Sequence, residues 1–198
     1  MNRTLLIILI LVGLVAFGGV LGISAYNQLV AVDEGVEQSW GDLQSQYQRR
    51  ADLIPNLVAT VQGAADFEQE TLTAVIEARA KATSISIDGA ALNDPSTMQA
   101  FANAQQELTG ALSRLLVSVE RYPQLTATAN FQDLQAQLEG TENRITVARR
   151  DYNAAVRGYN TRVRSFPTVL IASMTGFDRR APFEAAAGSD VAPSVSFD

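Results

Sequence analysis

The chain has 198 residues, which is room for one short anchor and one domain, and its formal net charge is −6. It contains no cysteine and no histidine, which excludes disulfides, thiolate metal sites, histidine–zinc sites and Ser-His-Asp triads. The acidic balance argues against nucleic acid as a partner.

The first predicted element is an N-terminal transmembrane helix, with residues 1–25 as the anchor. No charged residue lies between Arg3 and Asp33, and the most apolar part is Leu5–Ile23. At about 1.5 Å per residue this part spans roughly 28 Å, close to the hydrocarbon thickness of a bilayer. A cleaved secretory signal is the alternative, but its apolar core is usually only about 7–15 residues long. We therefore predict a retained signal-anchor that contacts the lipid bilayer through residues 5–23.

Charges on either side of the anchor predict its orientation. Arg3 precedes it, whereas Asp33, Glu34 and Glu37 follow it, and no basic residue occurs again until Arg49. The positive-inside rule then places the N-terminus in the cytoplasm and the domain outside, in a single-pass arrangement.

Residues 26–175 are predicted to form an all-α domain in which the anchor helix continues into an antiparallel bundle of long helices. Apolar side chains recur with a helical period along residues 29–54, 57–76, 101–119 and 131–166. No Gly-Pro break separates the anchor from the first of these stretches, so we predict one continuous helix from the membrane into the domain. Amphipathic helices bury their apolar stripes against one another, in coiled-coil-like packing.

Turn and cap residues predict where these helices end. Pro55 should end or kink the first helix, because proline lacks an amide hydrogen and clashes with the preceding turn. Asp94 is the expected N-cap of the third helix and Asn130 that of the last long helix, which Pro167 should close. The last 23 residues, 176–198, lack periodicity and are rich in small residues, so we predict a flexible C-terminal tail.

Two polar stretches, Gln46–Val58 and Leu134–Ile145, carry more polar detail than helix packing requires. A proline in the first leaves carbonyls of the preceding turn without their usual donors, which nearby arginine or asparagine side chains, or water, can replace. A glycine in the second costs about 1 kcal/mol against alanine and often permits close approach of another helix. The candidate interaction or structural residues are Arg49, Arg50, Asp52, Pro55, Asn56, Glu139, Gly140, Glu142, Asn143 and Arg144.

Glu139 and Glu142 lie three residues apart and therefore share a helix face. Paired carboxylates can act in acid–base catalysis or bind calcium or magnesium. On a continuous helix their oxygens do not converge as in a calcium loop, so ion pairs with Arg144 or Arg149 are the favoured interpretation. We predict no catalytic, cofactor-binding or metal-binding residues, and no enzyme activity.

A set of motifs is spread over the chain in a recognisable order and spacing. It comprises Tyr26-Asn27, Gln46–Val58, Glu120–Pro123, Asn130-Phe131, Gln137–Ile145, Ala148-Arg149, Tyr152-Asn153, Tyr159-Asn160 and Phe166-Pro167. In these motifs the sequence resembles the LemA family of bacterial membrane proteins. The resemblance implies a transmembrane helix in the bacterial inner membrane and a domain of long antiparallel helices. It implies no activity, although magnetosome-membrane members suggest a role in membrane organisation.

The leading hypothesis is a membrane-anchored, non-enzymatic scaffold or assembly protein whose polar stretches face a partner or set helix register in a homo-oligomer. Self-association or another membrane protein is the expected partner. Gly18 and Gly22 form a small-xxx-small pair of the kind that seats a second transmembrane helix, but glycines that face lipid are the favoured interpretation. A ligand-sensing bundle is an alternative that needs a sizeable cavity between helices. A third hypothesis is a carboxylate-dependent enzyme or metal module that uses Asp52, Glu139 and Glu142.

Overall fold

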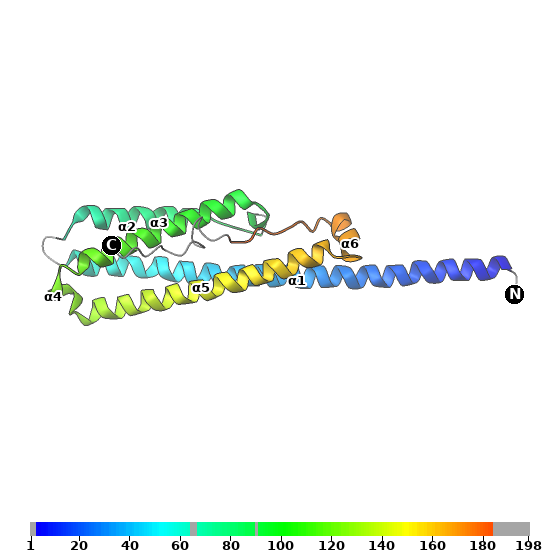
Figure 1. Ribbon diagram of the computed structural model, residues 1–198, viewed down its shortest axis with the longest axis horizontal. Helices are drawn as coiled ribbons and strands as arrows, with labels where there is room; N and C mark the ends of the chain where they lie inside the picture. The colour runs from blue at the N-terminus through cyan, green and yellow to red at the C-terminus, as the bar shows by residue number, and fades with distance from the viewer. Residues whose placement is uncertain (1–2, 64–66, 90, 184–198) are drawn as a thin grey trace, which may run out of the picture.

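The computed structural model describes residues 3–63, 67–89 and 91–183 (Figure 1). The regular elements in these ranges are helices, and no strand occurs among them. The predicted all-α fold, with a long apolar N-terminal helix that packs against others, is confirmed.

Helix α1, Arg3–Gln62, is continuous over 60 residues. Its N-terminal part projects alone from one end of the bundle (Figure 1). The large apolar side chains between Leu5 and Ile23 are exposed. Within the described ranges α1 is the one helix long and apolar enough to cross a membrane, and none of its most apolar window is buried in the protein. The predicted continuity from the apolar segment into the domain is confirmed.

The second half of α1 packs against three further long helices. Helix α5, Ala129–Arg164, runs back along α1, while α2, Gln69–Ser84, pairs with α3, Pro95–Val119 (Figure 1). Together these four helices form the predicted antiparallel bundle. Three short elements connect or follow them: the 3-10 helix η1, Ala91–Asn93, and the helices α4, Pro123–Thr126, and α6, Thr168–Thr175.

Buried apolar side chains form two clusters along the bundle. In the cluster nearer the projecting part of α1, the rings of Trp40 and Tyr152 meet edge to face with centroids 5.4 Å apart. The second cluster joins Ile54 of α1 to Leu108 of α3 and Leu138 of α5. The helical period in the sequence therefore identifies core positions in both clusters.

The helix ends agree only in part with the sequence signals. Asp94 caps α3 as predicted, because its carboxylate accepts hydrogen bonds from two backbone N–H groups of the first turn. The prediction of Asn130 as the cap of α5 is wrong, since the Thr128 hydroxyl accepts the capping bond from the Phe131 N–H. Both residue types are good caps, and only the chain path decides between them.

Residues 177–183, which we name the strap, correct the expectation of a flexible tail from residue 176. The chain leaves α6 through Gly176, whose φ of 77° lies in the left-handed region that favours glycine. It then extends back along the bundle, where Ala181 and Phe183 are buried and the Ala181 N–H donates to the Leu92 carbonyl at 2.8 Å. The remainder of the predicted tail, residues 184–198, lies outside the described residues.

Candidate functional site

Pro55 lies inside α1, which continues past it to Gln62. Because proline has no amide hydrogen, the carbonyl of Ala51, one turn earlier, lacks its usual donor within the helix. The Arg79 Nε on α2 donates to this carbonyl at 2.7 Å. Of the two predicted effects of Pro55, an end of the helix is thereby excluded. The expected donor is corrected as well, because it comes from another helix and not from the same polar stretch.

Arg50 is the central residue of the first polar stretch, and its side chain is only 3% exposed. Its Nη1 donates to Glu142 Oε2 at 2.8 Å and to Thr109 Oγ1 at 2.9 Å. Its Nη2 donates to Gln105 Oε1 at 2.6 Å. These bonds join α1, α3 and α5, and they bring the two polar stretches of the sequence together. A buried cation requires such partners, because removing it from water is costly.

Gln105 extends this network to the remaining long helix, because its Nε2 donates to the Ala82 carbonyl on α2 at 3.3 Å. One turn before Arg50, the Tyr47 hydroxyl accepts a hydrogen bond from Arg149 at 3.0 Å. Burial raises the pKa of Tyr47 above its ordinary value, although Arg149 acts in the opposite direction. We name Arg50 and its partners the Arg50 centre; it connects all four long helices at the level between the two apolar clusters.

The candidate carboxylates do not converge on one pocket. Glu142 binds Arg50. Glu139 accepts a hydrogen bond from Gln135, and Asp52 accepts one from Gln48, each within its own helix. Within the described ranges, no group of three or more histidine, cysteine, aspartate or glutamate side chains is arranged to hold a metal ion. This geometry gives the enzyme or metal-module hypothesis no support.

The other candidates lie on the outside of the bundle. Arg49, Asn56 and Asn143 are exposed. Arg144 donates to Gln46 Oε1 at 3.3 Å and so bridges α5 to α1 at the surface. A Cβ at Gly140 would meet only the Arg144 guanidinium, at an ordinary 3.6 Å, so this glycine is not needed for a close approach of helices within the chain.

Arg180, on the strap, is a second buried cation that the sequence analysis missed. Its side chain is 8% exposed, and its Nη2 lies 2.8 Å from Asp33 Oδ1 and 3.4 Å from Glu37 Oε1. Its Nη1 donates to the Gly89 carbonyl. The guanidinium also lies 5.9 Å from the centroid of the Tyr159 ring. This Arg180 centre ties the strap to Asp33 and Glu37, which follow the apolar segment on α1.

Two asparagines on α5 hold the backbone of the strap as a neighbouring β-strand would. Asn160 donates to the Arg180 carbonyl at 2.9 Å and accepts from the Arg180 N–H at 3.0 Å. Asn153 makes the same pair of bonds with Phe183, at 2.9 and 2.8 Å. The two asparagines are seven residues apart, or about two helical turns, and therefore lie on one face of α5.

A tyrosine precedes each of these asparagines and also binds the strap. The Tyr152 hydroxyl donates to the Ala181 carbonyl at 2.8 Å, and the Tyr159 hydroxyl donates to the Asp178 carbonyl at 2.7 Å. Burial raises the pKa of both hydroxyls to about 12, so both remain donors at neutral pH. The repeated Tyr-Asn pair was the sequence signal for this site, because amide and hydroxyl groups seven residues apart mark a polar line along a helix.

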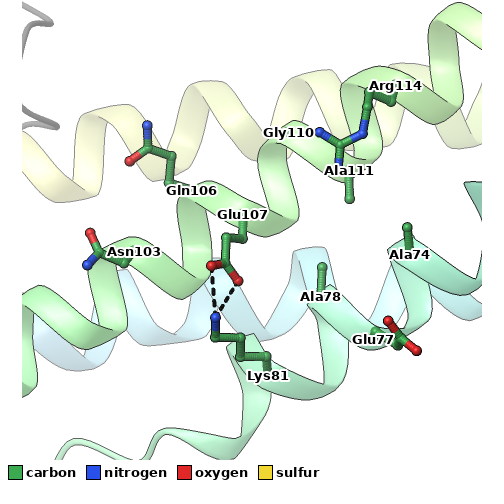
Figure 2. A pocket seen from close by; sticks show the side chains of 10 residues that line it. All are labelled: Ala74, Glu77, Ala78, Lys81, Asn103, Gln106, Glu107, Gly110, Ala111 and Arg114. Atoms are coloured by element: carbon green, nitrogen blue, oxygen red, sulfur yellow. Dashed lines mark hydrogen bonds and ion pairs between the residues drawn. The ribbon is translucent and has the colours of Figure 1, made fainter.

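A groove of about 720 Å³ runs between α2 and α3 and is open to solvent. Figure 2 shows Lys81 reaching across it to Glu107, and the two side chains form an ion pair at 2.6 Å. Both side chains are more than half exposed, so this pair stabilises little. A cavity beside Tyr47 and Phe101 measures about 120 Å³, smaller than the roughly 300–1,000 Å³ typical of ligand pockets. Neither feature favours the ligand-sensor hypothesis.

The sequence model of the LemA family matches residues 39–197, most of the chain. The chain belongs to the LemA family. Among its relatives, magnetosome protein MamQ 2 of Paramagnetospirillum magneticum is 26% identical over 195 residues, covering 90% of this chain and 71% of the relative. MamQ of Magnetospirillum gryphiswaldense is 25% identical over 170 residues, covering 78% of this chain and 62% of the relative. Protein LemA of Metamycoplasma hominis is 23% identical over 159 residues, with coverages of 80% and 68%.

The LemA match includes the central residues of both arginine centres. Arg50, Glu142 and Arg180 lie inside it, whereas Asp33 and Glu37, which bind Arg180, precede its first residue. The region matched by the LemA family is thus joined to the part of α1 that precedes it by ion pairs as well as by the continuous helix.

Proposed function

We propose that this LemA-family protein is a membrane-anchored, non-enzymatic scaffold that organises or assembles membrane components. The observation that carries the proposal is the apolar segment of α1, which projects from the bundle with its large side chains exposed. In water such a segment would keep a large apolar surface hydrated, whereas a bilayer about 30 Å thick removes that cost. The resemblance to proteins named for the magnetosome supports a role at a membrane.

The proposed location is the bacterial inner membrane, with one crossing, the N-terminus in the cytoplasm and the bundle outside. The charges support this orientation, because Arg3 precedes the apolar segment while Asp33 and Glu37 follow it. Residues 1–25 would then serve as the anchor and the four-helix bundle as the functional domain.

A structural role fits the bundle, because its buried arginines hold helices and the strap together and are not free to act on a substrate. Arg50 and Glu142 bind each other, and Arg180 binds two carboxylates of α1. The exposed candidates are available to a partner: Asn143 and Arg144 line a groove of about 390 Å³ between α5 and α1, with Asp42 on its other side. We propose that this groove is the self-association face, with another membrane protein as the alternative occupant.

Site-specific photo-crosslinking in native membranes tests this proposal. A photoreactive side chain at Asn143 should give a discrete product of twice the chain mass, or a product with one other membrane protein. The matched control is Thr73, an exposed position on α2 away from the groove, which should give little product. A monomer without crosslinks at both positions, at native expression, would contradict the scaffold proposal.

A further inference from the structure

We propose that α6 is a second membrane-contact element, which lies in the lipid–water interface beside the point where α1 leaves the bilayer. This inference rests on the proposed anchoring by α1 and adds a site to it. The partner is lipid: acyl chains against the outward face of α6 and head groups around its ends.

The position of α6 along α1 is the first argument. The Ile171 side chain on α6 lies 3.7 Å from where a Cβ of Gly22 would be, so the two helices are in close contact there. Gly22 is the penultimate residue of Leu5–Ile23, which has the length of a bilayer crossing. In Figure 1, α6 lies at the end of the bundle from which the apolar segment projects. A membrane that contains the apolar segment therefore has its surface at the level of α6.

The outward face of α6 is the second argument. Met174 is 83% exposed and Phe166, just before the helix, is 81% exposed, which makes them the most exposed large apolar side chains in the described ranges. Leu170, one turn before Met174, is 55% exposed. The opposite face, with Thr168 and Ala172, is buried against the bundle. A short helix whose apolar face points outward, at the membrane surface, has the chemistry of an interfacial element.

Aromatic and basic side chains around α6 are the third argument. The rings of Tyr26 and Phe177 meet edge to face with centroids 5.8 Å apart, just beyond the end of the apolar segment. Arg162 and Arg164, both exposed, lie in the last turn of α5 that leads to α6. Aromatic rings at the head-group level and arginines reaching to phosphates are the usual flanks of a membrane-contact segment.

Fluorescence of single-cysteine variants tests the inference, because the natural chain has no cysteine to remove. An environment-sensitive dye is attached to Met174→Cys in the full chain, reconstituted into vesicles of zwitterionic and anionic phospholipid. Val12→Cys reports on the proposed span, and Val117→Cys, an exposed apolar position on α3, is the matched control. We expect blue-shifted emission and quenching by head-group-level nitroxide lipids at 174, quenching by deep nitroxide lipids at 12, and neither at 117.

A water-exposed dye at 174 together with a lipid-exposed dye at 12 overturns the inference and leaves the anchoring intact. A water-exposed dye at 12 contradicts the anchoring itself, and the inference with it. A further variant combines Leu170→Glu and Met174→Glu and carries the dye at Phe166→Cys. It should move that dye into water, whereas the same double substitution should leave a dye at Val12→Cys in the lipid. If both positions respond alike, α6 has no contact of its own.

Discussion

Arg50 and Arg180 are both nearly fully buried, but the two centres are built from different parts of the chain. Arg50 projects from the interior of a long helix, and its partners lie on two other long helices. Its one carboxylate partner, Glu142, is 44% exposed at the surface. Arg180 lies on an extended strap, pairs with two carboxylates of α1, and has its backbone held by asparagine and tyrosine side chains.

Because of this difference, we expect the Arg50 centre to stabilise the whole bundle and the Arg180 centre to stabilise only the strap. The Arg50 centre forms only when three helices have the correct register, so its loss should weaken the whole bundle. The Arg180 centre holds a segment near the end of the described chain, so its loss should release the strap while the helices remain folded. We expect the largest loss of stability at Arg50, a local effect at the strap, and smaller effects at Arg79 and Asp94, which belong to neither centre.

Arg50→Ala should lower the free energy of unfolding of the domain by about 3 kcal/mol, because it removes the buried cation and takes the donor from Gln105 Oε1 and the ion-pair partner from Glu142. Denaturant unfolding in detergent, followed by helical circular dichroism, measures this. Arg49→Ala, at the exposed neighbouring position, should change stability by less than about 0.5 kcal/mol. Equal losses for the two variants would show that the Arg50 centre is not a global determinant.

Asn160→Ala should lower the free energy of local opening of the strap by about 2 kcal/mol, because both hydrogen bonds to the Arg180 backbone are lost. The amide hydrogens of the strap should then exchange roughly 30-fold faster. Hydrogen exchange at the Ala181 and Phe183 amides measures the opening, and the unfolding midpoint should change little. Asn143→Ala, at an exposed asparagine on the same helix, is the control. Faster exchange throughout α1 and α5 would mean that the strap is part of the global folding unit.

Arg79→Ala should lower the free energy of unfolding by about 1 kcal/mol in the natural chain, because the Ala51 carbonyl then loses its donor. In a Pro55→Ala background the restored amide hydrogen can bind that carbonyl, so the same substitution should cost much less. A double-mutant cycle on denaturant unfolding measures the coupling. Additive effects of the two substitutions would contradict the assignment of Arg79 as the replacement donor.

Asp94→Ala should change the free energy of unfolding least, and the size of this change should depend on pH. Hydrogen bonds from Thr97 and Ser96 lower the pKa of Asp94 from 3.8 to about 2. A carboxyl with a lowered pKa in the folded state stabilises the fold above its unfolded pKa and loses that effect as pH falls through its folded pKa. The stability difference between Asp94→Ala and the natural chain should therefore be full near neutral pH and shrink below about pH 4. A difference that persists below the folded pKa would place its origin in packing and not in charge.

The regular part of the fold could be predicted from the sequence, because apolar periodicity fixes which face of each helix is buried. The all-α bundle, the continuous first helix and the Asp94 cap follow from such local patterns. Arg50 and Glu142 were identified as candidates, but their pairing depends on the register between α1 and α5, which no local pattern contains. Arg79 was missed for the same reason, since its partner is 28 positions away in the sequence.

The strap could not be predicted from its own residues, because an extended segment has no helical period and few large apolar side chains. Its partners did leave a signal, the Tyr-Asn pair repeated seven residues apart on α5. The repeat alone does not show which segment of the chain these side chains bind, because that depends on the path of the chain after α6. The outward apolar face of α6 was not predicted either, because eight residues are too few to show a clear helical period.

We propose above all that the apolar start of α1 stays attached to the bundle and holds it to a membrane. Intact mass measurement of the protein purified from native cells, combined with flotation of the membranes, tests this directly. We expect the full chain of 21.3 kDa in the floating fraction, resistant to alkaline carbonate extraction. A soluble chain beginning near Tyr26, absent from the membranes, would contradict it.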